Sequence, residues 1–471
     1  MKLFVQIWVF FVGLIVLGLI VTVAWKKHAT EDSFNASFKR KDRVHLDHSA
    51  FFDKPFKSGH DVTRACLNCH NKAAKEVMAT AHFRWLSDKA QNKRTGKFEE
   101  IGKRNLLNNF CIGIRGNEAG CTKCHAGYGW KDASFDFSKE ENVDCLVCHD
   151  RSGGYVKGIA GLPEKDVDLL VSAQSVGFPL RENCGSCHSY GGGGKGVKHG
   201  DLDPSLDYPD PADDVHMGRA GMICIDCHGG HGHLIRGKAF SVSVDHDNGI
   251  GCVDCHQAKP HHDKRLDEHT DRVSCQACHI PTYANKLPTK TYWDWSKAGD
   301  DSREEDVHHY LKIKGEFEYG ESLVPEYYWF DLSVDRYLLG DPIAEHGPTN
   351  INTPRGTRKQ HDAKLWPFRV HRGKQPYDAK YKYIIPPVTS GDGGYWHEFD
   401  WDKALALGAD RVGLEYSGQY AFVDTQMFWP LSHLVVGADR ALQCNDCHGE
   451  RGRLDWRALG YGNDPMQSGA Q

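Results

Sequence analysis

The pattern Cys-x-x-Cys-His occurs eight times in this sequence. Its spacing places two thiols about one helical turn apart, with an imidazole directly after the second thiol. Two such thiols form thioethers with the vinyl groups of one haem, and the histidine supplies an axial ligand to the iron. The copies are Cys66-Cys69-His70, Cys121-Cys124-His125, Cys145-Cys148-His149, Cys184-Cys187-His188, Cys224-Cys227-His228, Cys252-Cys255-His256, Cys275-Cys278-His279 and Cys444-Cys447-His448.

Other uses of these cysteines explain the pattern less well. Zinc sites would need the pairs to combine in fours, and they give no reason for a histidine after every second cysteine. Disulfides across two residues would be strained and labile. The motifs contain sixteen of the seventeen cysteines. The sequence therefore predicts eight covalently bound haem c groups, and with them redox chemistry or electron transfer.

The sixth ligand of each iron separates an electron carrier from a catalyst. A second histidine saturates the iron, whereas an open or replaceable position admits a substrate. Of the 28 histidines, twenty lie outside the motifs, so their number alone does not select the ligands. For each candidate the alternative is a surface histidine. His231 could serve in place of His233, and His262 in place of His261. The predicted distal ligands are His48, His82, His216, His233, His261, His269 and His433.

Two further features fall outside the repeated motif. Cys111 is the remaining cysteine, and an unpaired cysteine in an exported protein is inert, paired between chains, or reactive. The segment 190–200 is rich in glycine, which lets a backbone pass close to a flat cofactor. Its Lys195 and Lys198 could hold an anion, and a desolvated lysine can become neutral and bind a metal. The alternative for this segment is a flexible basic loop.

The motifs extend from Cys66 to His448 at irregular intervals, which indicates one haem-threaded body and no fixed repeat. We expect a mainly α-helical fold with extensive irregular loops, in which the haems form much of the core. Helices are predicted at 73–85, from Pro163 onward, and from an Asp400 cap to Gly408. The net charge of -5 offers no broad basic surface for nucleic acid.

The N-terminus carries an apolar segment long enough to cross a bilayer. The stretch 3–25 has no charged residue and ends without a clear cleavage site, which favours a retained anchor over a cleaved signal peptide. Lys26 and Lys27 alone would place the body in the cytoplasm, but covalent haem attachment takes place outside it. We therefore expect the haem-bearing body to lie in the periplasm. The predicted parts are an anchor at 1–25, a juxtamembrane linker at 26–44 and a single octahaem catalytic body at 45–471.

Long strings beyond the haem motifs resemble the octahaem tetrathionate reductase family, which is related to hydroxylamine oxidoreductase and cytochrome c nitrite reductase. They span about His48 to His448 and include SGHDVTRACLNCH, NNFCIGI, CTKCHAGYGWKD, ENCGSCHSYGGGGKGVKHGDLD and RGKQPYD. The resemblance implies that the haem of the motif ending in His125 is catalytic, with Lys198 as its distal ligand and Cys111 as the active-site cysteine. An acidic residue is expected at Lys195, and this departure leaves substrate identity open.

The resemblance implies reduction of tetrathionate to two thiosulfates, with nitrite or hydroxylamine as further substrates. Arg115 and Lys195 are candidates for docking the anion. Electrons would come from a membrane quinol-linked donor or a soluble cytochrome, and assembly into a homo-oligomer is compatible with the sequence. Two alternatives remain open: a hydroxylamine or hydrazine oxidase, and a non-enzymatic, membrane-anchored electron conduit.

Overall fold

The structure, a computed structural model, describes residues 45–86, 88–91, 96–110, 112–191, 193–237, 240 and 249–467. The predicted anchor at 1–25, the linker at 26–44 and Cys111 lie outside these ranges. Within them, no helix has the length and apolar character needed to cross a bilayer.

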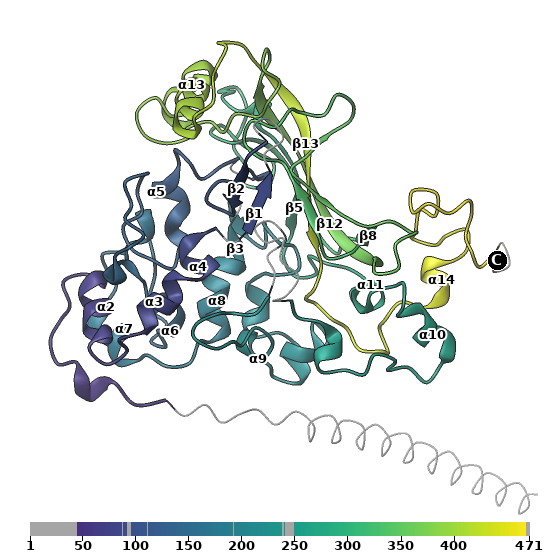
Figure 1. Ribbon diagram of the computed structural model, residues 1–471, viewed down its shortest axis with the longest axis horizontal. Coiled ribbons are helices and arrows are strands. Elements are labelled where there is room, and N and C mark those ends of the chain that lie inside the picture. The colour runs from purple at the N-terminus through teal and green to yellow at the C-terminus, as the bar shows by residue number, and fades with distance from the viewer. Residues whose placement is uncertain are drawn as a thin grey trace, which may run out of the picture.

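Short helices make up the N-terminal half, and most of them coincide with haem motifs because Cys-x-x-Cys-His closes about one helical turn. They lie together on one side of the sheet (Figure 1). The α-helices are α2 (Gly59–Leu67), α3 (Ala73–Met78), α4 (Ala81–Arg84), α5 (Glu118–Cys121), α6 (Leu146–His149), α7 (Leu169–Gln174), α8 (Arg181–His188), α9 (Cys224–Cys227), α10 (Lys264–His269), α11 (Cys275–His279), α12 (Tyr395–Glu398), α13 (Trp401–Val412) and α14 (Cys444–Cys447). Shorter helical turns are η1 (Ser49–Phe51), η2 (Thr122–Cys124), η3 (Glu140–Asn142), η4 (Ile159–Gly161), η5 (Pro204–Asp207), η6 (Val215–Arg219), η7 (Cys252–Asp254) and η8 (Trp295–Lys297).

A seven-stranded sheet dominates the C-terminal half. Its central strand β12 pairs antiparallel with β13 and β8 and parallel with β5. The strands of the described chain are β1 (Asp88–Gln91), β2 (Phe98–Ile101), β3 (Tyr190–Gly191), β4 (Gly194–Lys195), β5 (Thr289–Asp294), β6 (Tyr310–Leu311), β7 (Gly315–Gly320), β8 (Glu326–Phe330), β9 (Val334–Arg336), β10 (Thr349–Asn350), β11 (Asn352–Pro354), β12 (Lys364–Asp378) and β13 (Tyr420–Pro430).

The expectation of a mainly α fold is not confirmed. The structure is 25% helical and 18% strand. The largest buried cluster packs on the sheet and includes the stacked indoles of Trp293 and Trp295, whose ring centres lie 4.8 Å apart. The difference arises between the seventh and eighth motifs, where aromatic and β-branched side chains pair across strands far apart in sequence.

Several predicted elements occur with different limits. The helix expected at 73–85 is interrupted by extended backbone at Thr80. No helix starts at Pro163; α7 begins after Asp168, whose carboxylate accepts hydrogen bonds from two backbone amides of the first turn. Asp400 does cap α13, but the helix continues through Gly408 to Gly413, which adopts a φ of 72°.

Candidate functional site

Six of the eight motif histidines have a second histidine at a nearly constant distance, with ring centres 6.0–6.4 Å apart. Two imidazoles on opposite sides of one metal would be separated by about 6 Å, since each metal–nitrogen bond takes about 2 Å and each ring centre lies about 1 Å further. The residues therefore fit haem iron between them. The pairs, motif histidine first, are His70–His48, His149–His233, His188–His82, His228–His433, His256–His216 and His448–His269.

The remaining ring nitrogen of most of these histidines has a protein partner. A metal-bound histidine usually donates its other N–H to a carbonyl or carboxylate, which fixes the ring and leaves the opposite nitrogen for the metal. Seven of the twelve histidines have Nδ1 2.7–3.2 Å from such an oxygen: His48 (Leu46), His149 (Gly177), His228 (Arg236), His233 (Glu76), His269 (Arg265), His433 (Asp201) and His448 (Asp464).

His279 differs from these pairs. Its Nδ1 lies 3.0 Å from the carbonyl oxygen of Val436, but across the described ranges its ring has no histidine at the separation of the six pairs. His261 is the one predicted distal ligand outside the six pairs, and its Nδ1 lies 3.1 Å from Asp267 Oδ1. Its role as a distal ligand stays a prediction.

His188 has two imidazole neighbours, His82 and His199, each 6.2 Å away. Sequence reasoning did not select His199, although it directly follows Lys198 in the glycine-rich segment. Its Nε2 is buried without a hydrogen-bond partner among the described residues. Either side chain could complete the coordination of this haem.

We expect His82→Ala to convert about one haem in eight from low-spin to high-spin iron, because it removes a sixth ligand. His199→Ala should leave every haem low-spin. Low-temperature EPR of the oxidised variants measures both. A high-spin signal in His199→Ala alone would transfer the ligand assignment to His199.

His125 has a different environment. Its ring is buried against Phe83, Trp85 and Trp130, and none of its described ring neighbours is a second imidazole. Nε2 lies 2.6 Å from the Phe83 carbonyl oxygen, and the buried Nδ1 has no partner in the described chain. Burial, with the charge of Lys157, lowers the pKa of His125 to about 3. The ring is therefore neutral, the form that coordinates a metal.

Lys198 is held beside this motif by the sheet. Arg369 of β12 donates to its carbonyl oxygen at 2.8 Å, and Thr289 of β5 donates to the carbonyl of the preceding Val197 at 3.1 Å. Burial and the nearby charge of Lys103 lower the pKa of Lys198 to about 8. A buried amine with this pKa is partly neutral near physiological pH, so its nitrogen can act as a ligand.

Contacts between motif thiols show which haem sites are neighbours. Thiols of different motifs lie close enough to shift each other's pKa, which places the first motif beside the third, the second beside the fourth, the fourth beside the fifth and the sixth beside the seventh. The contacts are Cys66–Cys145, Cys124–Cys187, Cys184–Cys224 and Cys252–Cys275. The motif of His125 is therefore adjacent to the motif of His188.

One face of β12 contacts both the segment of Lys198 and the segment that precedes Cys111. Arg369 contacts the segment of Lys198. Two residues along, on the same face, His371 lies with its ring centre 4.4 Å from that of Phe110, the residue before Cys111. Side chains two apart on a strand point the same way, so the sheet brings these segments to one region. The position of Cys111 itself lies outside the described residues.

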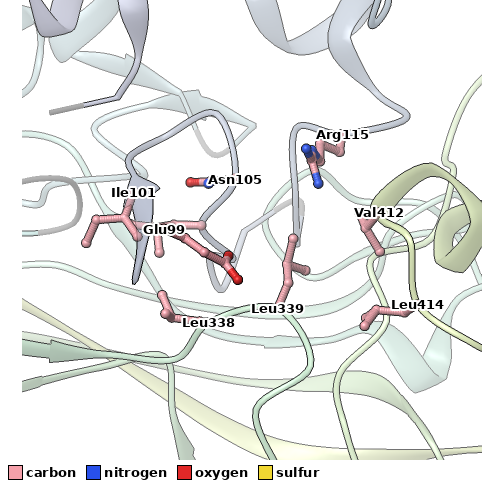
Figure 2. A pocket seen from close by; sticks show the side chains of 9 residues that line it. Glu99, Ile101, Asn105, Arg115, Leu338, Leu339, Val412 and Leu414 are labelled. Carbon is pink, nitrogen blue, oxygen red and sulfur yellow. The ribbon is translucent and has the colours of Figure 1, made fainter. Parts of the chain in front are cut away.

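The structure does not group the two predicted anion-docking residues with Lys198. Arg115 lines a cavity of about 130 Å³ with Glu99, Leu338 and Leu414, where it lies across from Glu99 (Figure 2). Lys195 is exposed on β4, and no described contact joins its side chain to Lys198. Both roles stay predictions.

Lys103 is a better-placed cation that sequence reasoning missed. Its Nζ lies 4.0 Å from the ring centre of Trp85, whose ring contacts His125. Its charge lowers the pKa of both Cys124 and Lys198. A single lysine in a charged stretch carries no motif, so only the tertiary structure reveals its place.

Repeated haem-attachment motifs with imidazoles paired at the separation for iron define a multihaem c-type cytochrome. The comparisons with known proteins agree. A family model described as bacterial cytochrome c matches residues 290–451. An uncharacterised protein of Archaeoglobus fulgidus is 25% identical over 240 residues, covering 40% of this chain and 80% of that protein.

The crystal structure of an octahaem cytochrome c from Shewanella oneidensis is 45% identical in sequence, with a TM-score of 0.84. The match covers 90% of this chain and 98% of that one. The chain belongs to the octahaem c-type cytochrome family, and it is a redox protein with covalently bound haem c.

Proposed function

We propose that the protein reduces a small sulfur or nitrogen oxyanion, with tetrathionate as the first candidate, at the haem site of the motif ending in His125. Eight haems would be attached through the sixteen motif cysteines. The observation that supports this site is Lys198, a half-buried amine that the sheet holds close to Cys124 of the same motif and whose pKa is lowered to about 8. A ligand of this kind is replaceable, and a replaceable ligand gives access to a substrate.

The roles of the chain's own residues follow from their positions. His125 and Lys198 would both hold the haem iron, and Lys198 would move aside when the anion arrives. Lys103 contributes positive charge to the same region. Cys111 would exchange with the sulfur chain or hydrogen-bond the anion. The haem, when bound, supplies electrons one at a time. Tetrathionate takes up two electrons, its central S–S bond breaks, and two thiosulfates leave.

The body would lie in the periplasm, with residues 1–25 as its anchor. A quinol-linked or soluble cytochrome donor would deliver electrons to the histidine-paired sites. The neighbouring motifs of His125 and His188 would then form the last step toward the substrate. A pure electron conduit would have an imidazole as the second ligand at the site of His125, whereas none of the described ring neighbours of His125 is a histidine and Lys198 lies near its motif.

The proposal is tested by anaerobic turnover with a reduced viologen as donor and tetrathionate, nitrite or hydroxylamine as acceptor. We expect tetrathionate turnover that falls in Cys111→Ser. His346→Ala, at an exposed histidine that belongs to none of the described pairs and is not a candidate ligand, is the control. Turnover with nitrite or hydroxylamine alone would transfer the activity to nitrogen chemistry. If Cys111→Ser and Lys198→Ala both turn over every acceptor at the wild-type rate, the site assignment fails.

A further inference from the structure

A buried ion pair lies behind the proposed catalytic site. Lys157 Nζ is 2.7 Å from Asp144 Oδ2, and the two side chains are 4% and 0% exposed. Buried pairs are weak evidence for a role in stability, since apolar replacements of similar volume are often neutral or stabilising. The placement of the two charges therefore suggests another role.

The cation is at the site of His125. Lys157 Nζ donates hydrogen bonds to the backbone carbonyl oxygens of His125 and, at 3.1 Å, of Gly127. The ammonium group therefore contacts the segment that would hold the proposed catalytic iron.

The anion is at the next haem motif. Asp144 directly precedes Cys145 and accepts a hydrogen bond from the amide of Val147, inside that motif, at 3.0 Å. The hydroxyl groups of Tyr128 and Tyr155 also donate to it, at 2.8 and 2.9 Å. These hydrogen bonds stabilise the buried negative charge of the carboxylate and fix its position.

We propose that the charges of the Asp144–Lys157 pair tune reduction potentials. They raise the potential of the haem at His125 relative to that of the haem at Cys145 and Cys148. A positive charge stabilises the reduced iron, a negative charge stabilises the oxidised iron, and both effects are strong where water is excluded. The pair thus biases electrons toward the site of Lys198. The inference rests on the proposed function only for the identity of that site.

The test is an EPR-monitored redox titration of the holoprotein, following the signal that Lys198→Ala removes. The double variant Lys157→Met/Asp144→Asn leaves no uncompensated charge. We expect the ratio of reduced to oxidised iron at this site, at a fixed potential, to fall about tenfold, equivalent to a midpoint shift of about 59 mV for one electron. Asp144→Asn alone should shift the midpoint upward, because Lys157 keeps its charge.

The matched control is Lys259→Met/Asp271→Asn, an exposed pair of the same residue types with the same 2.7 Å separation. It should leave the midpoint unchanged. Equal midpoints in the double variant and the wild type, or shifts of the same sign in the single and double variants, would overturn the inference.

Haem content by pyridine haemochrome verifies that each variant is fully loaded. Absence of the signal in the wild type would refute the Lys198 assignment instead.

Discussion

Lys198→Ala is expected to lower kcat/KM for tetrathionate by about 10²–10³-fold, the scale observed when one charge-stabilising donor is removed from an active site. Its ammonium form offers positive charge to a dianion, and its neutral form can hold the iron until the anion arrives. Alanine can do neither. Steady-state kinetics with a reduced viologen measures the effect.

Lys195→Ala is the comparison for that variant. Lys195 is exposed and only three residues away, so solvent screens its charge. We expect its kcat/KM to stay within about threefold of the wild type. Equal losses in the two variants would mean that the loop contributes only general positive charge, and the distinct role of Lys198 would be lost.

Arg369→Met is expected to lower the free energy of unfolding by about 2–5 kcal/mol, because the carbonyl oxygens of Lys198 and Lys290 lose this donor at a cost of about 1–3 kcal/mol each, whereas that of Val197 keeps the Thr289 hydroxyl. The guanidinium is fully buried and donates to the carbonyl oxygens of Val197, Lys198 and Lys290. Turnover should fall as well, since Lys198 loses its anchor to the sheet. Denaturant titration and kinetics measure the two effects.

Arg372→Met is the matched control, three residues along the same strand. Arg372 is half-exposed and forms a bidentate ion pair with Glu326 at 2.8 and 3.0 Å. Surface pairs of this kind contribute about 0–1 kcal/mol. If both variants unfold at the same denaturant concentration, the role assigned to the buried guanidinium is wrong.

The haem chemistry could be predicted from the sequence because it depends on local spacing. Cys-x-x-Cys-His needs one helical turn and no distant partner. Six of the seven predicted distal histidines lie 6.0–6.4 Å from a motif histidine, and their role as ligands stays a prediction. His199 was missed because a histidine beside a lysine gives no indication of which of the two faces which haem.

The sheet was missed because its pairing is non-local. β12 joins β5 and β13, which lie far from it in sequence, and no short pattern specifies such partners. The same limit applies to Arg369, Lys157 and Lys103, whose roles come from groups many residues away. Gly408 illustrates a local failure. This glycine lies inside α13 and does not end the helix. A Cβ at this position would approach Pro386 O to 1.9 Å, so close packing explains why the residue is glycine.

The most direct test is low-temperature EPR with near-infrared magnetic circular dichroism of the oxidised holoprotein, on the wild type and on Lys198→Ala. The proposed function predicts a histidine/lysine-ligated signal for about one haem in eight, which is absent from the variant, while the other signals remain bis-histidine. Eight bis-histidine haems, unchanged by the substitution, would contradict the account and leave an electron conduit as the better description.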